Sequence, residues 1–235
     1  MKTETIVYRD GDVECHGHLA YDPDAGARPT VLICHAWGGL GDFERDKAAK
    51  LVEQGYTALA LDVYGGGKVG SGPEENGALM GPFMEDRAML QRRLLAGLEA
   101  VRSQPACDAS RVAAVGYCFG GLCVLDMARS GADLKGVVSF HGLFAPNGLE
   151  ARPIRAKVLV CHGYDDPMAK PDQMVALAQE LTEGGADWQI HAYGGTVHSF
   201  TNPAAKAPES GTAYNEASAR RSFQSMTDFL AEALA

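Results

Sequence analysis

The stretch Arg111–Met127, RVAAVGYCFGGLCVLDM, contains a strand, a sharp turn and a helix in immediate succession. Residues 111–115 predict a short apolar strand, and residues 121–128 predict a helix so apolar that it must be buried. The intervening turn forces its central residue into a strained backbone conformation, which requires flanking positions without side chains, here Gly116 and Gly120. The pattern is typical of a nucleophile elbow with Cys118 in place of serine.

Cys118 is expected to sit at the N-terminus of the predicted helix. Unpaired N–H groups and the helix dipole at that position favour a thiolate over a thiol. The alternative interpretation is a glycine-rich turn that holds a buried and inert cysteine. The motif alone does not distinguish a reactive Cys118 from an inert one, so the distinction depends on the other segments of the chain.

Length, composition and charge limit the possible classes of protein. With 235 residues, 46% of them apolar, the chain is long enough for one large core, and we expect a single domain over residues 1–235. The formal net charge is -9 and the basic residues are dispersed, so the basic surface of a nucleic-acid-binding protein is missing. Nucleic acid is therefore not an expected partner.

The sequence contains no recognisable targeting segment. The N-terminal residues MKTETIVYRDGD include no apolar run, and no stretch of 18 apolar residues occurs anywhere. We therefore expect a soluble, cytoplasmic protein without a membrane partner. The cysteines lack C-x-x-C spacing and several lie in apolar segments, which favours reduced thiols over disulfides. They are Cys15, Cys34, Cys107, Cys118, Cys123 and Cys161.

Apolar strands alternate with helices along most of the chain. Strands are predicted at residues 3–9, 13–21, 30–35, 56–61, 111–115, 134–140, 156–161 and 188–193, and helices at 42–54, 85–102, 121–128, 171–182 and 213–234. Residues 68–83, rich in proline and glycine, are predicted to form a long loop. This order predicts an α/β fold with a doubly wound, mostly parallel sheet, whose ligands bind at the carboxyl ends of the strands.

Three chemically suited residues each follow a predicted strand. Cys118 follows residues 111–115, Asp166 lies in HGYDDP after residues 156–161, and His198 lies in the loop after residues 188–193. The order nucleophile, acid, histidine is that of the α/β-hydrolase fold, which argues against the inert cysteine.

The loop after residues 30–35, AWGG, is glycine-rich, and in this architecture such a loop supplies an oxyanion donor. The acids Asp42, Glu44 and Asp46 open the next helix and are interpreted as a cap and first-turn charges. His16 and His18 share one strand face, but no third ligand lies nearby in the sequence, so a packed or solvated face is favoured over a metal pair.

The sequence resembles the dienelactone hydrolase family over nearly its whole length. The resemblance rests on three motifs, GYCFGG at 116–121, HGYDDP at 162–167 and VHSFTNP at 197–203. It implies a minimal α/β-hydrolase without a cap domain, in which Cys118 is the nucleophile, His198 the base and Asp166 the orienting acid. Asp165 is the alternative acid. The backbone N–H groups of Phe119 and Trp37 would form the oxyanion hole.

Three positions depart from the dienelactone-cleaving members of that family. Ala36 replaces a glutamate associated with switching the thiol on, and Gly66 and Asn202 replace arginines associated with binding a substrate carboxylate. Aromatic and apolar side chains near the expected site offer a hydrophobic wall instead. The candidate pocket residues are Trp37, Tyr64, Met80, Phe83 and Phe144.

The expected function is hydrolysis of small-molecule esters or lactones through a covalent cysteine intermediate, with a preference for neutral, hydrophobic, activated esters. No metal or cofactor is required. Cleavage of neutral phosphotriesters in the same site and carboxymethylenebutenolidase (dienelactone hydrolase) activity are the alternatives. A non-catalytic, thiol-based sensor or binding protein on a hydrolase fold is an alternative of another class, and turnover of a chromogenic ester would separate it from an enzyme. The sequence specifies neither the natural substrate nor the oligomeric state.

Overall fold

The computed structural model describes all residues, 1–235, and shows a mixed α/β fold built on mostly parallel strands. The predicted fold class is therefore confirmed. Two compact units divide the chain, Met1–Ala114 and Val115–Ala235. None of the helices combines the length and the apolar character needed to cross a bilayer.

The first unit contains four complete strands in the order β1-β2-β4-β3. They are β1 (Lys2–Asp10), β2 (Val13–Tyr21), β3 (Arg28–Cys34) and β4 (Thr57–Ala60). As predicted, β1 and β2 form an antiparallel hairpin, and the turn between them uses Gly11 at φ 58°. β3 and β4 pair in parallel, and β4 is buried at every residue, as expected for a strand covered on both faces.

Three helices belong to the first unit. They are α1 (Asp42–Glu53), α2 (Pro73–Glu85) and α3 (Arg87–Arg102). α1 contacts β2, β3 and β4, and α3 contacts β1. The contact with β1 includes two ion pairs of the buried Asp10, which accepts hydrogen bonds from the exposed Arg92 at 2.9 Å and from the buried Arg93 at 3.0 Å.

The prediction of a long loop over residues 68–83 is wrong, because α2 begins at Pro73. Proline is well tolerated in the first turn of a helix, where its missing N–H would have no partner. Gly77, Gly81 and Pro82 lower the intrinsic helix propensity, but α2 packs against α3 and buries Phe83, and this tertiary contact outweighs the local preference. Asp86 then separates α2 from α3.

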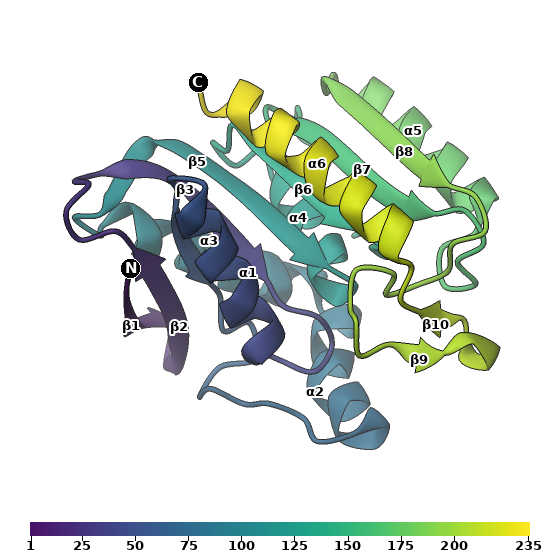
Figure 1. The fold of residues 1–235 in the computed structure, drawn as a ribbon, viewed down its shortest axis with the longest axis horizontal. Helices are drawn as coiled ribbons and strands as arrows, with labels where there is room; N and C mark the ends of the chain where they lie inside the picture. The colour runs from purple at the N-terminus through teal and green to yellow at the C-terminus, as the bar shows by residue number, and fades with distance from the viewer. The chain divides into compact units, whose positions relative to one another are not determined.

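The chain passes into the second unit along β5 (Cys107–Tyr117). Three parallel strands follow in the order β6-β7-β8: β6 (Gly136–Phe140), β7 (Lys157–Gly163) and β8 (Trp188–Tyr193). The helices are α4 (Phe119–Arg129), α5 (Pro171–Glu183) and α6 (Glu216–Ala233). Figure 1 shows α6, in yellow, on one face of these strands, with α4 and α5 on the other, which is the doubly wound arrangement.

The last helix begins later than predicted. Thr212 and Ala213 pair with Ala207 and Lys206, so that β9 (Lys206–Ala207) and β10 (Thr212–Ala213) flank a single 3₁₀ turn, Pro208–Ser210. Asn215 then caps α6 by accepting a hydrogen bond from the Ser218 N–H at 3.0 Å. The small hairpin carries no apolar periodicity, which explains why the sequence pattern missed it.

Candidate active site

Cys118 occupies the turn between β5 and α4. Its backbone has φ 56° and ψ -115°, a conformation that L-residues rarely adopt, and it is the N-cap of α4. A Cβ on Gly116 would overlap the backbone carbonyl of Gly120, so the first glycine of the motif is required by a close approach. Every residue of α4 is buried, as predicted. Phe119 is its first residue, where helix geometry provides no i−4 carbonyl for the N–H.

Cys118 is the most exposed of the six cysteines, all of which are free. The other five cysteines are buried. Burial raises the pKa of Cys15 to about 11 and the pKa values of Cys34 and Cys161 to about 12, and it also raises the pKa of Cys107. A low-dielectric surrounding disfavours a thiolate at each of these four positions.

His198 and Asp166 form a buried hydrogen-bonded pair in the second unit. Nδ1 of His198 lies 2.7 Å from Oδ2 of Asp166, and each residue is 1% exposed. The other carboxylate oxygen accepts a hydrogen bond from the Met168 N–H at 2.8 Å. The loop of His198 is fixed by two backbone bonds, from its N–H to Gly211 O and from the Ala213 N–H to its carbonyl. Asp166 therefore orients one ring nitrogen of His198.

The protonation state of His198 follows from its neighbours. Burial alone lowers its pKa, but the hydrogen bond that His198 donates to Asp166 and the nearby Cys118 thiol outweigh burial and raise the pKa of His198 to about 10. Its Nε2 is buried and hydrogen-bonds to no protein atom. A thiol beside a carboxylate-oriented imidazole is the arrangement that activates a cysteine nucleophile.

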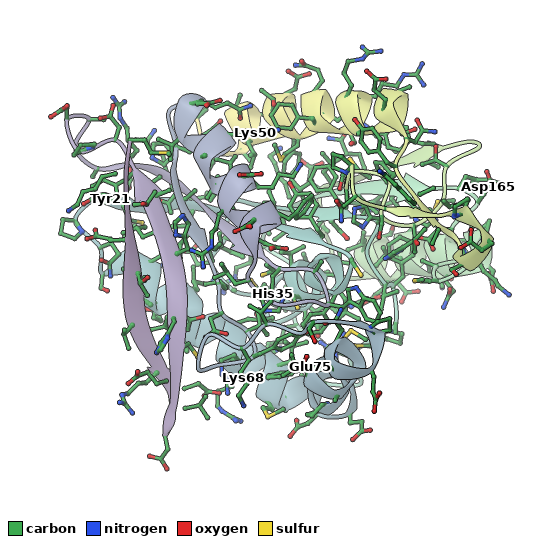
Figure 2. All side chains as sticks on the ribbon, turned by 60° about the horizontal axis from the view of Figure 1, so that its bottom comes forward. Tyr21, His35, Lys50, Lys68, Glu75 and Asp165 are labelled. Atoms are coloured by element: carbon green, nitrogen blue, oxygen red, sulfur yellow. The ribbon has the colours of Figure 1, made fainter.

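The alternative acid, Asp165, occupies a different environment. Its side chain is exposed at the surface of the loop after β7 (Figure 2), and its backbone N–H donates to Thr196 O at 3.0 Å. Of the two adjacent aspartates, Asp166 alone makes a hydrogen bond to His198.

The loop after β3, in the first unit, is held by a buried carboxylate. Glu44 Oε1 accepts from the Ala36 N–H at 3.1 Å, and Glu44 Oε2 accepts from the Gly41 N–H at 2.9 Å. The bond from the Gly41 N–H is the expected N-terminal cap of α1, whereas the bond from the Ala36 N–H was not expected. Nδ1 of His35, labelled in Figure 2, donates to the Ala36 carbonyl at 2.7 Å. The conformation of the segment that contains Trp37 is thus fixed by side chains beneath it.

The structure brings together three of the five candidate pocket residues. In the first unit, the Tyr64 hydroxyl donates to Trp37 O at 2.7 Å, and the rings of Tyr64 and Phe83 lie 5.7 Å apart. Trp37 remains 38% exposed, and Met80 lies one helical turn before Phe83 on α2. In the second unit, Phe144 packs against the ring of His162, with 4.9 Å between the centroids.

Sequence reasoning overlooked one further residue at the site, His141. It follows β6 at φ 38°, it is buried, and its Nδ1 accepts a hydrogen bond from the Cys118 N–H at 3.1 Å. Its ring also lies 5.2 Å from the ring of His198. A His-Gly pair directly after a predicted strand occurs at both 141–142 and 162–163, and the first of these pairs was the signal in the sequence.

The two histidines of β2 make hydrogen bonds to different side chains. His16 Nε2 lies 2.9 Å from Glu14, and His18 Nδ1 accepts from Arg45 at 3.0 Å. No cluster of three or more histidine, cysteine, aspartate or glutamate side chains with a suitable arrangement occurs in the chain.

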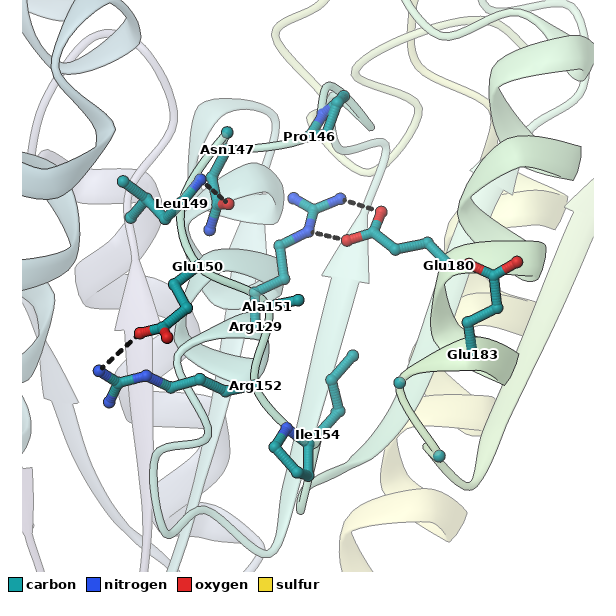
Figure 3. A pocket seen from close by; sticks show the side chains of 14 residues that line it. Arg129, Pro146, Asn147, Leu149, Glu150, Ala151, Arg152, Ile154, Glu180 and Glu183 are labelled. Carbon is teal, nitrogen blue, oxygen red and sulfur yellow. Dashed lines mark hydrogen bonds and ion pairs between the residues drawn. The ribbon is translucent and has the colours of Figure 1, made fainter.

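A cavity of about 580 Å³ lies elsewhere in the second unit, between the loop 146–153 and the C-terminal end of α5. Figure 3 shows the Arg129 guanidinium at its wall, joined to Glu180 by hydrogen bonds of 2.6 and 2.8 Å. Arg129 also donates to Asp126 and to two backbone carbonyls, so each of its five N–H groups has an acceptor. The cavity shares no residue with the site around Cys118.

Comparison with known proteins identifies the family. Residues 16–234 match the dienelactone hydrolase family. The chain belongs to this family. The predicted enzyme class, a hydrolase that acts on ester or lactone bonds, is therefore confirmed.

Several relatives match the chain over nearly its whole length. The carboxymethylenebutenolidase of Pseudomonas putida is 28% identical over 242 residues, which cover 98% of this chain and 97% of that enzyme. A dienelactone hydrolase-like promiscuous phosphotriesterase from metagenomic libraries has a solved structure that is 36% identical, covers 100% of this chain and 99% of its own, and superposes with a TM-score of 0.94. Another solved structure, named m3DLH, is 37% identical with the same coverage and a TM-score of 0.95.

Proposed function

We propose that this hydrolase cleaves esters or lactones by nucleophilic acyl transfer through Cys118, with His198 as base and Asp166 as the orienting acid. The observation that carries the proposal is the state of the His198 ring. Nδ1 is held by Asp166 at 2.7 Å, while Nε2 has no hydrogen-bond partner and the Cys118 thiol is close enough to raise the pKa of the ring. One nitrogen is thus oriented and the other remains available for proton transfer.

The first half-reaction forms an acyl-enzyme. His198 Nε2 accepts the thiol proton, and Sγ attacks the substrate carbonyl to give a tetrahedral oxyanion. The intermediate collapses when the bond to the leaving alcohol breaks, and the imidazolium of His198 returns its proton to the alcohol oxygen. Asp166, whose hydrogen bond raises the pKa of His198 in the free site, stabilises this imidazolium as the proton arrives.

The second half-reaction hydrolyses the thioester. Nε2 of His198 accepts a proton from water, and the resulting hydroxyl attacks the thioester carbonyl. Collapse of the second tetrahedral intermediate breaks the bond between carbon and Sγ and releases the carboxylic acid, and the imidazolium of His198 returns its proton to Sγ. Backbone N–H groups of Phe119 and Trp37 are the proposed donors to both oxyanions. The location of Phe119 at the start of α4 and the bracing of the Trp37 loop by Glu44 support these assignments.

The proposed substrates are neutral and hydrophobic. Trp37 is exposed and lies beside the buried aromatic rings of Tyr64 and Phe83, and none of the three side chains carries a charge. The two positions that carry arginine in dienelactone-cleaving relatives are Gly66 and Asn202. An uncharged aryl ester fits this composition better than a carboxylate-bearing lactone.

Phosphotriester cleavage is the second candidate activity. It is favoured by the 36% identity to a promiscuous phosphotriesterase over the whole chain. A neutral phosphotriester passes through a species with oxyanion charge on phosphorus, which the same two N–H groups would stabilise. Hydrolysis would then proceed through a phosphorylated Cys118.

Trapping the covalent intermediate tests the proposal. The protein is mixed with a chromogenic aryl ester in a single turnover, quenched with acid and analysed by peptide mass spectrometry. We expect an acyl group on Cys118, a burst of the leaving phenol, and loss of both in Cys118→Ala, while the matched control Cys107→Ala retains them. Wild-type turnover by Cys118→Ala would refute the mechanism, and a reactive thiol without any turnover would favour a sensor.

A further inference from the structure

We propose that His141 is a positioning residue that connects the nucleophile turn to the loop carrying His198. The inference rests on the proposed roles of Cys118 and His198. His141 makes one hydrogen bond to the nucleophile turn and one to the loop that carries His198. Its Nδ1 lies 3.1 Å from the Cys118 backbone nitrogen, and its Nε2 lies 2.8 Å from Oγ1 of Thr201, three residues after His198.

The two contacts fix the tautomer of His141. A backbone N–H can only donate, so Nδ1 must accept from Cys118 and carries no proton. The ring proton then resides on Nε2, which donates it to Oγ1 of Thr201. His141 is therefore a neutral ring with an acceptor on the nucleophile side and a donor on the histidine side. Among common side chains, only imidazole offers this acceptor and donor on opposite edges of one rigid ring.

Strained backbone conformations occur in the nucleophile turn, at His141 itself and in the loop that carries His198. Only three non-glycine residues in the chain have a positive φ, namely Cys118 at 56°, His141 at 38° and Ser199 at 58°. One is the proposed nucleophile, one is His141, and one directly follows His198. Strain that persists in a folded protein is over-determined by its surroundings and concentrates at functional sites. The strained positions thus coincide with the segments that His141 joins.

Packing around the ring leaves it no freedom to move independently. His141 is 2% exposed, and its ring contacts His198 and Phe200 edge to face, with 5.2 Å between the centroids in each case. Thr201 is 6% exposed. The His198 ring is thereby supported by Asp166 at Nδ1 and by the His141 ring along its side.

The consequence concerns the distance between Sγ of Cys118 and Nε2 of His198. These two atoms lie on segments that are far apart in the sequence and have no covalent link nearby. The Cys118 N–H is shared between the Phe140 carbonyl at 3.0 Å and Nδ1 of His141 at 3.1 Å, so the end of β6 and the His141 ring hold the nucleophile turn together. The ring alone extends this contact to the second segment, through Thr201, and thereby contributes to the separation of the two atoms. A misplacement of about 1 Å in such a pair costs on the order of a hundredfold in rate.

Removing one contact at a time tests the inference. In His141→Asn, the side-chain oxygen can still accept from Cys118 N–H but does not reach Thr201, and asparagine tolerates a positive φ. In Thr201→Val, the acceptor for Nε2–H is lost. We expect each variant to lower kcat at least about tenfold, with KM within about threefold, and to shift the pH profile of Cys118 alkylation. His191→Asn and Thr227→Val are matched controls, and both should retain the wild-type values.

The double variant decides between coupling and two independent effects. If His141 links the segments, Thr201→Val has no further effect in the His141→Asn background, because the contact is already absent. If Thr201→Val lowers kcat by the same factor in the wild-type and the His141→Asn backgrounds, the inference is overturned. Wild-type kcat and a wild-type alkylation profile in His141→Asn would also overturn it. Circular dichroism and thermal unfolding establish that the variants are folded.

A separate variant distinguishes this inference from the proposed function. If Cys118→Ala is inactive while the His141 and Thr201 variants behave as wild type, only the positioning role fails. If Cys118→Ala itself retains turnover, the proposed mechanism fails, and the role of His141 fails with it.

Discussion

Asp166 Oδ2 lies 2.7 Å from His198 Nδ1, and both side chains are buried. The preceding residue, Asp165, is exposed. Two adjacent carboxylates therefore have different environments, since one is committed to an imidazole in a low-dielectric interior and the other faces water. A hydrogen bond in such an interior is electrostatically stronger than in solvent.

This contrast predicts different effects of two nearly identical substitutions. Asp166→Asn keeps the shape of the side chain but offers an amide where His198 needs an anionic acceptor, so kcat should fall by about 10²–10⁴. Asp165→Asn should remain within about threefold of wild type, because its side chain makes no bond to His198. Steady-state kinetics on an aryl ester measures both. A larger loss for Asp165→Asn would mean that the acid has been wrongly chosen.

The raised pKa of His198 also predicts a pH dependence of stability. The ring binds its proton more tightly in the folded protein, with a pKa of about 10 against an ordinary value of 6.5. Its contribution is therefore fully present below pH 6.5 and is lost as the pH rises through about 10. The difference in unfolding free energy between wild type and His198→Gln should be largest near pH 6 and should shrink by pH 10.5. A difference that grows with pH would show that the folded-state pKa is not raised.

The sequence was sufficient to predict the architecture and the order of the candidate triad. Glycine spacing around Cys118, short apolar strands and chemically distinctive residues directly after those strands are local signals. The strands at 13–21 and 188–193 begin and end where they were predicted. Burial and periodicity act over a few residues, so they can be recognised without knowing the fold.

Features that depend on tertiary contacts escaped prediction. α2 contains two prolines and two glycines, and its helical state depends on packing against α3. Glu44 was recognised as a helix cap, but it also accepts a hydrogen bond from the Ala36 N–H, eight residues back along the chain. His141 and Thr201 are 60 residues apart, and nothing in the sequence links them.

Alkylation provides a test of the accessible thiol. Because burial raises the pKa values of Cys15, Cys34, Cys107 and Cys161, these thiols should react slowly at about pH 6. Cys118, at the start of α4 beside His198, should react first, and turnover should be lost in proportion. Peptide mass spectrometry after partial modification with iodoacetamide gives the order directly. Preferential labelling of a different cysteine with full retention of activity would contradict the prediction.

Glu44 provides a test of the loop that contains Trp37. Glu44→Ala leaves the Ala36 and Gly41 N–H groups without their side-chain acceptor, which should lower the unfolding free energy by about 1–3 kcal/mol. If Trp37 N–H stabilises the oxyanion, kcat should fall as well, while KM changes little. Asp46→Asn, on the exposed side of the same helix, is the control and should leave both quantities unchanged. If stability falls but kcat is unchanged, Glu44 caps α1 but does not position the Trp37 N–H for catalysis.

Substrate charge is the property in which this chain should differ most from dienelactone-cleaving relatives. A charge-assisted hydrogen bond from arginine to a substrate carboxylate contributes about 1.5–3 kcal/mol, or about ten- to a hundredfold in kcat/KM. Gly66 and Asn202 cannot supply it, and the net charge of -9 opposes the approach of an anion. We therefore expect neutral aryl esters, and neutral phosphotriesters, to be cleaved with a higher kcat/KM than any carboxylate-bearing dienelactone.

Restoring a cation tests the cause of that preference. Gly66 has φ 67°, so a side chain there would be strained, whereas Asn202 has an ordinary backbone and uses its side chain only to cap the Ala204 N–H at 2.9 Å. Asn202→Arg should raise kcat/KM for the dienelactone relative to the aryl ester by about tenfold. Asn202→Gln, which alters the same turn without adding charge, should leave the ratio unchanged. A wild-type preference for the dienelactone by tenfold or more would instead show that another cation, such as Lys68 or Arg87, already binds the carboxylate.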